Sequence, residues 1–142
     1  MNPLAAPYFY GLDEPLPADL VESYVKALVC VARANGIVES ESRVIQGAAE
    51  ILGAMPFTVS RALAGSADLG PALAPLREHA SLMTLLYRDA LLVVRADGVT
   101  TSEEEVTLMQ MATQLGLTKA QREAATKAAD MLSDLRQAMK NL

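Results

Sequence analysis

Apolar residues along this chain recur at intervals of three and four positions, which is the spacing of one face of an α-helix. The clearest stripe runs from about Pro17 or Ala18 to Ala34. Similar stripes predict helices over about 40–52, 56–63, 75–96 (or 81–96) and 102–115, and a last helix that begins after residue 118. No segment alternates convincingly with the period of two that a β-strand needs. The pattern therefore predicts an all-α fold, a compact bundle of six or seven helices.

The sequence contains an internal repeat of one helical hairpin. Residues 24–43 align with residues 86–105 at an offset of 62, and 6 of the 20 positions are identical. The identities cluster at a helix end and in the turn after it, around Gly36 and Gly98. We therefore expect a bundle of two pseudo-repeated hairpins. If these pack as equivalents, their turns lie at one end of the domain.

Composition agrees with packed helices. The 142 residues are 51% hydrophobic but only 4% aromatic, with no Trp, which suits helices better than a β-sandwich. The net charge of −5 argues against a nucleic-acid partner, which needs clustered Lys and Arg. A single cysteine, Cys30, excludes an internal disulfide and is expected to be a small buried apolar residue.

Two further features of the sequence concern the subcellular location of the protein. The first residues lack the basic start and apolar run of a signal peptide. The most apolar stretch, Leu82–Ala96, is too short and too charged to span a bilayer. We expect a cytoplasmic protein that does not cross a membrane.

The first 17 residues differ from the rest of the chain. They contain four prolines and three of the six aromatic residues, so residues 1–17 are predicted to form an extended arm and 18–142 a single helical domain. One interpretation is an arm folded back over its own core. The other is an aromatic anchor that inserts into another chain.

The second hairpin carries a recognisable motif. An Ala-Asp-Gly turn at 96–98 is followed by a hydroxyl residue four positions after the Asp, a Glu seven positions after it, and an amphipathic helix ending in Leu-Gly-Leu at 115–117. This pattern resembles the TerB-like tellurite-resistance family. The matching positions are Thr101, Glu104, Leu108, Met111, Ala112, Leu115 and Gly116.

The first hairpin matches less closely. Asn35 replaces the Asp, Glu39 stands at the cap position, and Glu41 aligns with Glu104 once a one-residue gap is allowed. The resemblance covers about residues 20–120. It implies a non-enzymatic role in the response to tellurite or another stress, with protein partners near a membrane and no spanning segment.

The acidic turns are also the candidate site. Carboxylate and amide oxygens of this kind suit a hard cation such as Ca²⁺ or Mg²⁺, and the resemblance implies a metal as well. The alternative is simple helix capping, because Thr101 and Glu104 form a capping box and acidic residues favour the positive end of a helix. The candidate ligands are Asn35, Glu39, Glu41, Asp97, Glu103 and Glu104.

The last helix suggests a partner surface. Apolar residues step by four and three along it, as in a heptad seam. Either this helix docks on its own domain, or it pairs with a second copy or with another protein. The seam residues are Ala124, Ala128, Met131, Leu135, Ala138 and Leu142.

Three functions follow from these patterns. The first is a non-enzymatic interaction module of TerB-like type, responsive to a divalent cation. The second is a purely structural protein–protein scaffold without metal. The third is a metal-assisted hydrolase that uses the paired carboxylates, which is disfavoured because His79 is isolated and no nucleophile motif is present.

Overall fold

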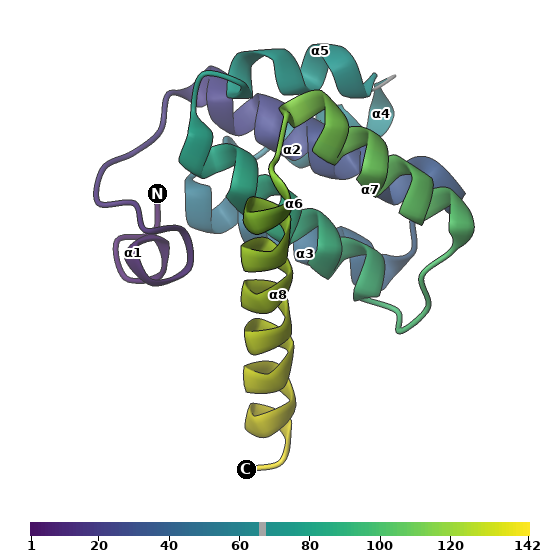
Figure 1. Cartoon of the computed structure of the whole chain (residues 1–142). Coiled ribbons are helices and arrows are strands. Elements are labelled where there is room, and N and C mark those ends of the chain that lie inside the picture. The colour runs from purple at the N-terminus through teal and green to yellow at the C-terminus, as the bar shows by residue number, and fades with distance from the viewer. Residues whose placement is uncertain (66–67) are drawn as a thin grey trace.

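The computed structural model describes residues 1–65 and 68–142, apart from the side chain of Asn35. Within this part the chain is all-α, with no β-strand, as the sequence predicted (Figure 1). The helices are α1 (Ala5–Tyr10), α2 (Ala18–Ala32), α3 (Glu39–Leu52), α4 (Thr58–Ala64), α5 (Leu69–Leu73), α6 (Ala80–Arg95), α7 (Ser102–Leu115) and α8 (Lys119–Lys140), with 3₁₀ turns η1 (Arg33–Asn35) and η2 (Ala74–Leu76).

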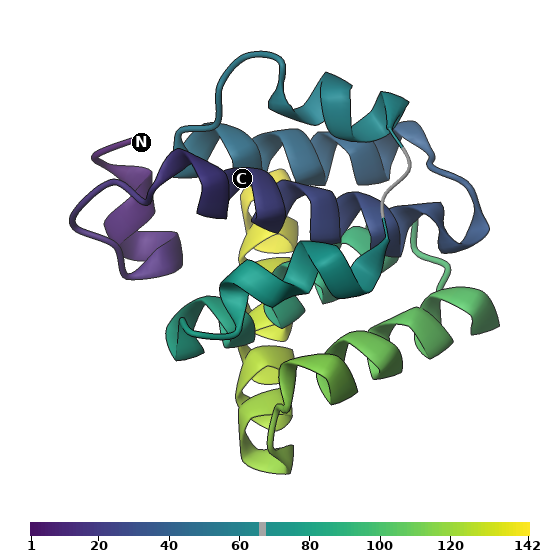
Figure 2. The same ribbon diagram turned by 90° about the horizontal axis from the view of Figure 1, so that it is seen from above.

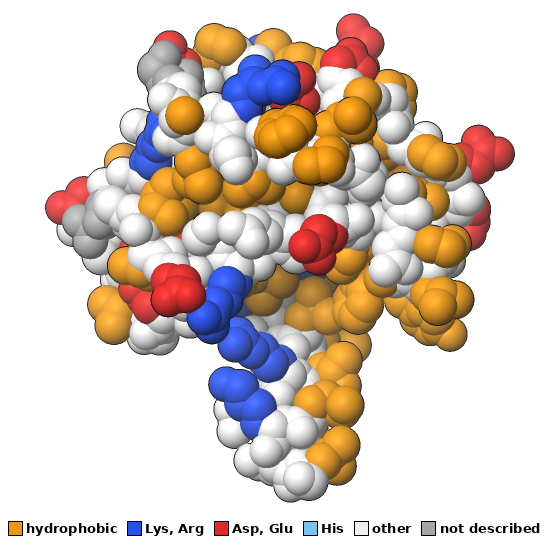
Figure 3. Space-filling model, turned by 180° about the vertical axis from the view of Figure 1, so that it is seen from behind, with side chains coloured by type: hydrophobic (Ala, Val, Ile, Leu, Met, Phe, Trp, Pro, Cys, Tyr) orange, Lys and Arg blue, Asp and Glu red, His pale blue; other side chains and the backbone are white. Residues whose placement is uncertain are grey.

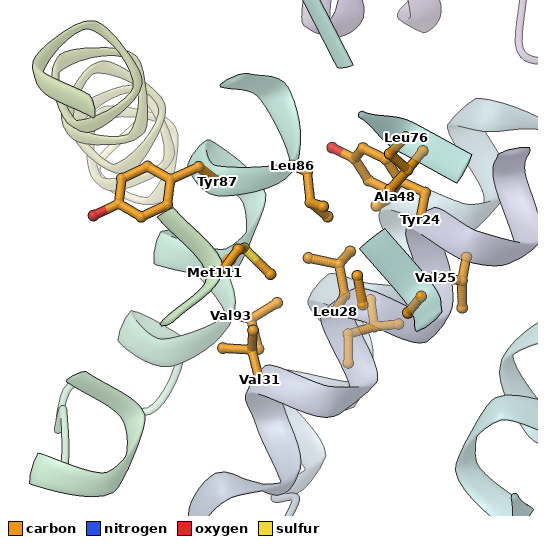
Figure 4. Close-up of a cluster of buried hydrophobic side chains, with 14 of the residues drawn as sticks. Tyr24, Val25, Leu28, Val31, Ala48, Leu76, Leu86, Tyr87, Val93 and Met111 are labelled. Carbon is orange, nitrogen blue, oxygen red and sulfur yellow. The ribbon is translucent and has the colours of Figure 1, made fainter. Parts of the chain in front are cut away.

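The hydrophobic core lies around α2 and α6. These two helices pack against each other, and both are apolar on most sides in their central turns. Tyr24 and Leu28 of α2, Leu86 and Val93 of α6, and Met111 of α7 are fully buried and lie close together (Figure 4). Burial of this aliphatic surface is the main stabilising term for the bundle.

Helix α8 differs from the others in its direction. It packs on α6 near its own start, crosses the other long helices and then extends beyond the body (Figures 1 and 2). Ala125 and Ala129 are buried against the body, whereas residues 133–142 are all exposed. The second half of α8 therefore stands free of the domain that carries it.

The prediction of a wholly extended arm was wrong, because residues 5–10 form α1. Pro7 lies in the first turn of α1, where backbone N–H groups have no partner within the helix, so its missing donor costs nothing. Hydrophobic periodicity also predicted no helix between residues 63 and 75, but α5 and the start of η2 lie there; residues 66 and 67 are outside the described part. These short elements explain why the described part of the chain has eight α-helices instead of six or seven.

The two hairpins, α2–η1–α3 and α6–α7, share local geometry. Gly36 and Gly98 follow the first helix of each with φ of 81° and 79°. Gly53 and Gly116 end the second helix of each in the left-handed conformation, with φ of 82° and 68°. Glycine adopts this conformation without steric cost, so both helices stop at the equivalent position.

The two hairpins differ in the partner of the arginine that follows or ends their first helix. The Arg33 guanidinium donates hydrogen bonds to the carbonyl oxygens of Ala62, Leu63 and Gly65, at the end of α4. The equivalent Arg95 instead pairs with Asp130 of α8, at 2.7 Å. The same position thus ties each copy to a different neighbouring helix.

Candidate functional site

Capping interactions fix Glu41 and Glu104 at the starts of α3 and α7. Glu104 and Thr101 form the predicted capping box: the Glu104 carboxylate accepts the Thr101 N–H at 3.1 Å, and Thr101 Oγ1 accepts the Glu104 N–H at 3.2 Å. Glu41 accepts the Val38 N–H at 3.1 Å. Val38 has no side-chain acceptor, so the first hairpin makes only one arm of the box.

The two glutamates meet inside the molecule. Glu41 is 2% exposed and Glu104 is 3% exposed, although both belong to charged helix starts. Their carboxyl groups lie close enough to interact, and this proximity is one of the causes that raise the pKa of Glu41. The turns of the two hairpins therefore converge. The contact is made by equivalent residues, because Glu41 is the third residue of α3 and Glu104 is the third residue of α7.

The surroundings of Glu41 favour its protonated form. Burial raises the pKa of Glu41 to about 7, and the nearby charges of Glu104 and Asp97 act in the same direction, against the Val38 N–H. Two neighbouring carboxylates repel each other when both are ionised, which favours a proton on one of them. Among the described residues, no donor reaches the second oxygen of Glu104, Oε2, which is also buried.

The other predicted ligands do not join this pair. Asp97 is exposed and its Oδ1 accepts the Val99 N–H at 2.9 Å. Glu39 is exposed and pairs with Arg43 at 2.7 Å. Glu103 is exposed at the surface of α7.

The side chain of Asn35 lies outside the described part. Within that part, no three His, Cys, Asp or Glu side chains are placed to hold one metal ion. Of the six predicted ligands, the structure brings together Glu41 and Glu104.

A second polar cluster was not predicted. Asp89, in the middle of α6, is 3% exposed. Its Oδ2 accepts the hydroxyls of Tyr10 at 2.7 Å and Tyr24 at 2.6 Å, and its Oδ1 accepts Arg88 Nε at 3.1 Å and Nη2 at 2.9 Å. Arg88 also donates to the carbonyl oxygen of Phe9 and stacks over the Tyr10 ring, 4.8 Å from its centroid. The sequence signal was an Arg-Asp pair inside an otherwise apolar helix.

The surroundings favour neutral tyrosines and a charged arginine in this cluster. Burial and the Asp89 carboxylate raise the pKa of both tyrosines well above their ordinary value, so both hydroxyls remain donors. Burial opposes the charge of Arg88, but the neighbouring Asp89 outweighs it and raises the pKa of the guanidinium. The cluster ties α1 to α2 and α6.

Helix α8 does dock on its own domain, but not through the predicted seam. Ala125 and Ala129 make the contact, and Leu132 is half-buried. Met131, at 63% exposed, and Leu135, at 51%, face away from the body. In the space-filling view, hydrophobic side chains follow one side of the free half of α8 and Lys and Arg the other (Figure 3). No helix in the described part is long and apolar enough to cross a membrane.

Comparison with known proteins gives one similar structure. No family model matches the sequence, and a search of curated proteins finds no match. The crystal structure of a tellurite resistance protein from Nostoc punctiforme superposes with a TM-score of 0.76 at 21% identity, over 97% of this chain and 88% of that chain. The chain therefore has the fold of this tellurite resistance protein, as its Ala-Asp-Gly motif predicted.

Proposed function

We propose that this chain is a non-enzymatic stress-response module of the tellurite-resistance type, and that its Glu41–Glu104 pair exchanges a proton for a divalent cation. The observation that carries the proposal is the buried contact between these carboxyl groups, with one oxygen left without a donor. An acceptor that is desolvated and unpaired is costly, so a bound cation would stabilise it. The shared fold supports the stress-response assignment.

The donor set favours magnesium over calcium. Ca²⁺ takes six to eight oxygen ligands, whereas Mg²⁺ is commonly held by one or two carboxylates and keeps several waters. The pair supplies two carboxylates, and a third acidic ligand is absent from the described residues. Glu41 and Glu104 would hold the ion directly, while Asp97 would add negative charge from nearby. The ion would supply charge neutralisation at the turns of both hairpins.

A titration with MgCl₂ at two pH values tests this proposal. The amide NMR signals of residues 35–41 and 97–105 should shift together at millimolar Mg²⁺, because both turns contribute a ligand. Affinity should be higher at pH 8 than at pH 6, since the proton on the pair must leave before the ion enters. CaCl₂ in a parallel titration should shift the same signals more weakly.

Paired variants provide the control. Glu41→Gln and Glu104→Gln should each abolish the shifts, whereas Glu39→Gln and Glu103→Gln alter exposed residues one or two positions away and should preserve them. Shifts that persist in Glu41→Gln, or that vanish in Glu39→Gln, would contradict the assignment of ligands. Absence of any shift in the wild type would leave a scaffold without metal.

That scaffold is the second candidate, and the absence of a third acidic ligand in the described part favours it. In this case the two carboxyl groups share only a proton and lock the two hairpins together. Both candidates use a protein partner, and the free half of α8 is the surface we expect it to contact. A second copy of the chain is the simplest occupant, because a helix with one apolar side can pair with itself.

An enzymatic role has little support among the described side chains. Burial raises the pKa of the Cys30 thiol, which is the opposite of what a nucleophile needs. Asp89 is fully engaged by Arg88 and the two tyrosines. We infer a cytoplasmic location from the sequence alone, and contact with a membrane complex remains a proposal that follows from the resemblance.

A further inference from the structure

A cleft opens where α8 leaves the body, between α1, α3, α6 and α8. Its volume is about 270 Å³. Hydrophobic side chains are visible in the hollow beside the free half of α8 (Figure 3). The apolar walls come from four helices and consist of Phe9, Val44, Ala48, Ile51, Leu92, Ala96 and Leu132.

The polar groups of this cleft are mainly arginines. Arg88, Arg95 and Arg136 all line it, although the chain as a whole has a net charge of −5. Asp89 also lines it, but its carboxylate is already bonded to Arg88 and to two tyrosine hydroxyls. Asp89 therefore offers no free charge to a ligand.

The two outer arginines differ in their partners. Arg95 pairs with Asp130 at 2.7 Å, in a contact that is partly exposed. Arg136, one turn beyond Leu132 on α8, makes no ion pair with any described residue. At the rim of the cleft, Arg136 therefore has no ion-pair partner among the described residues, and Arg95 has only the partly exposed Asp130.

We propose that this cleft binds a single-chain aliphatic carboxylate of medium length, with the tail against the apolar walls and the carboxylate at Arg136 and Arg95. An apolar concavity with a few convergent polar groups is the usual form of a small-molecule site. Its volume lies just below the range of about 300–1,000 Å³ that is typical of drug-sized ligands, so a two-chain lipid is too large. The arginines select an anion over an amine or a neutral chain.

The probe is sodium decanoate, below its micelle concentration, added to the full chain and followed by amide NMR. Shifts should concentrate on the cleft residues of α3, α6 and α8. Arg136→Gln should weaken binding about two- to fivefold, the range of an exposed ion pair. Ser133→Trp should abolish binding, because Ser133 is exposed at the edge of the cleft and the indole would fill it.

Two matched variants separate the cleft from general effects on α8. Lys140→Gln removes another exposed cation one turn away, and Gln137→Trp adds the same bulk at an exposed position that does not line the cleft. Both should bind decanoate as the wild type does. Melting curves confirm that all four variants are folded.

Three results would overturn the proposal. The first is the absence of saturable shifts in the cleft. The second is equal binding of decylamine and decanoate, which would show that the arginines do not select the ligand. The third is unchanged binding by Ser133→Trp, which would place the ligand elsewhere.

Discussion

Among the described residues, buried charged side chains occur in two places, and different contacts stabilise each of them. The Arg88–Asp89 cluster keeps its charges and satisfies them with tyrosine hydroxyls and a backbone carbonyl. The Glu41–Glu104 pair makes no ion pair with any described residue, and burial raises the pKa of Glu41, which favours a bound proton. One site is therefore fixed and the other can respond to pH or to an added ion.

The first prediction concerns Asp89. Asp89→Ala should lower the free energy of unfolding by about 3–5 kcal/mol, because it leaves a buried guanidinium without its counter-ion. Urea denaturation measures the effect. Asp130→Ala removes the partner of Arg95 at an exposed pair and should cost no more than about 1 kcal/mol. Similar costs for the two variants would contradict the central role of the Asp89 cluster.

The second prediction concerns the pH dependence of stability. Because the pKa of Glu41 is raised to about 7 in the folded state, the folded chain binds more protons than the unfolded chain between about pH 4.5 and 7. This group's contribution is therefore complete below its unfolded pKa and is lost as pH rises through the folded pKa, by about 1–3 kcal/mol.

Urea denaturation at pH 5 and pH 8 measures that loss. The decrease in stability on going from pH 5 to pH 8 should be smaller in Glu41→Gln than in the wild type, since the amide does not titrate. Glu39→Gln alters an exposed carboxylate two positions away and should retain the wild-type decrease. An equal decrease in Glu41→Gln would exclude a raised pKa at this residue.

At the scale of elements, the first and last helices depart most from the sequence-based expectation. Four prolines predicted an extended arm, but a proline in the first helical turn is tolerated, and Tyr10 and the Phe9 carbonyl anchor α1 to α6. Heptad spacing identified an apolar stripe on α8, but the docking face is the neighbouring one that carries Ala125 and Ala129. Spacing alone cannot tell which of two adjacent apolar faces meets the core.

The third prediction is made for α8. Truncation after Ser133 removes only exposed residues, so the melting temperature of the monomer should change little. If α8 mediates self-association, light scattering should give a dimer for the full chain and a folded monomer for the truncated one. A full chain that is monomeric at all concentrations would exclude pairing through α8.

The fourth prediction is made for α1. Deletion of residues 1–12 removes Tyr10 and the Phe9 carbonyl from the buried cluster, so it should lower the melting temperature markedly. Tyr8, in contrast, is 90% exposed, and Tyr8→Ala should leave stability unchanged. A stable deletion variant that has lost only self-association would instead identify the arm as an anchor for another chain.

For the whole molecule, local rules predicted most of the architecture. Helix periodicity and the capping box at Thr101 were visible in the sequence, and both are present. The left-handed glycines at the helix ends and the capping box at Thr118 likewise depend only on neighbouring residues. The one-residue gap that aligns Glu41 with Glu104 is consistent with their equivalent positions in α3 and α7.

Long-range contacts were less predictable. The sequence suggested that two acidic turns converge, but it did not separate the two inward glutamates from the exposed Glu39, Glu103 and Asp97. It also did not identify the tyrosine partners of Asp89, because Tyr10 lies 79 residues away in the chain and Tyr24 lies 65 residues away. Such contacts depend on how the helices cross, which local patterns do not specify.

The central claim is that the two hairpins meet at a buried carboxyl pair that shares a proton. A pH titration of the glutamate side-chain ¹³C signals by NMR tests it most directly. The account predicts one glutamate that titrates near pH 7 in the wild type and whose titration is absent in Glu41→Gln. Titration of every glutamate near its ordinary value of about 4.3 would contradict it.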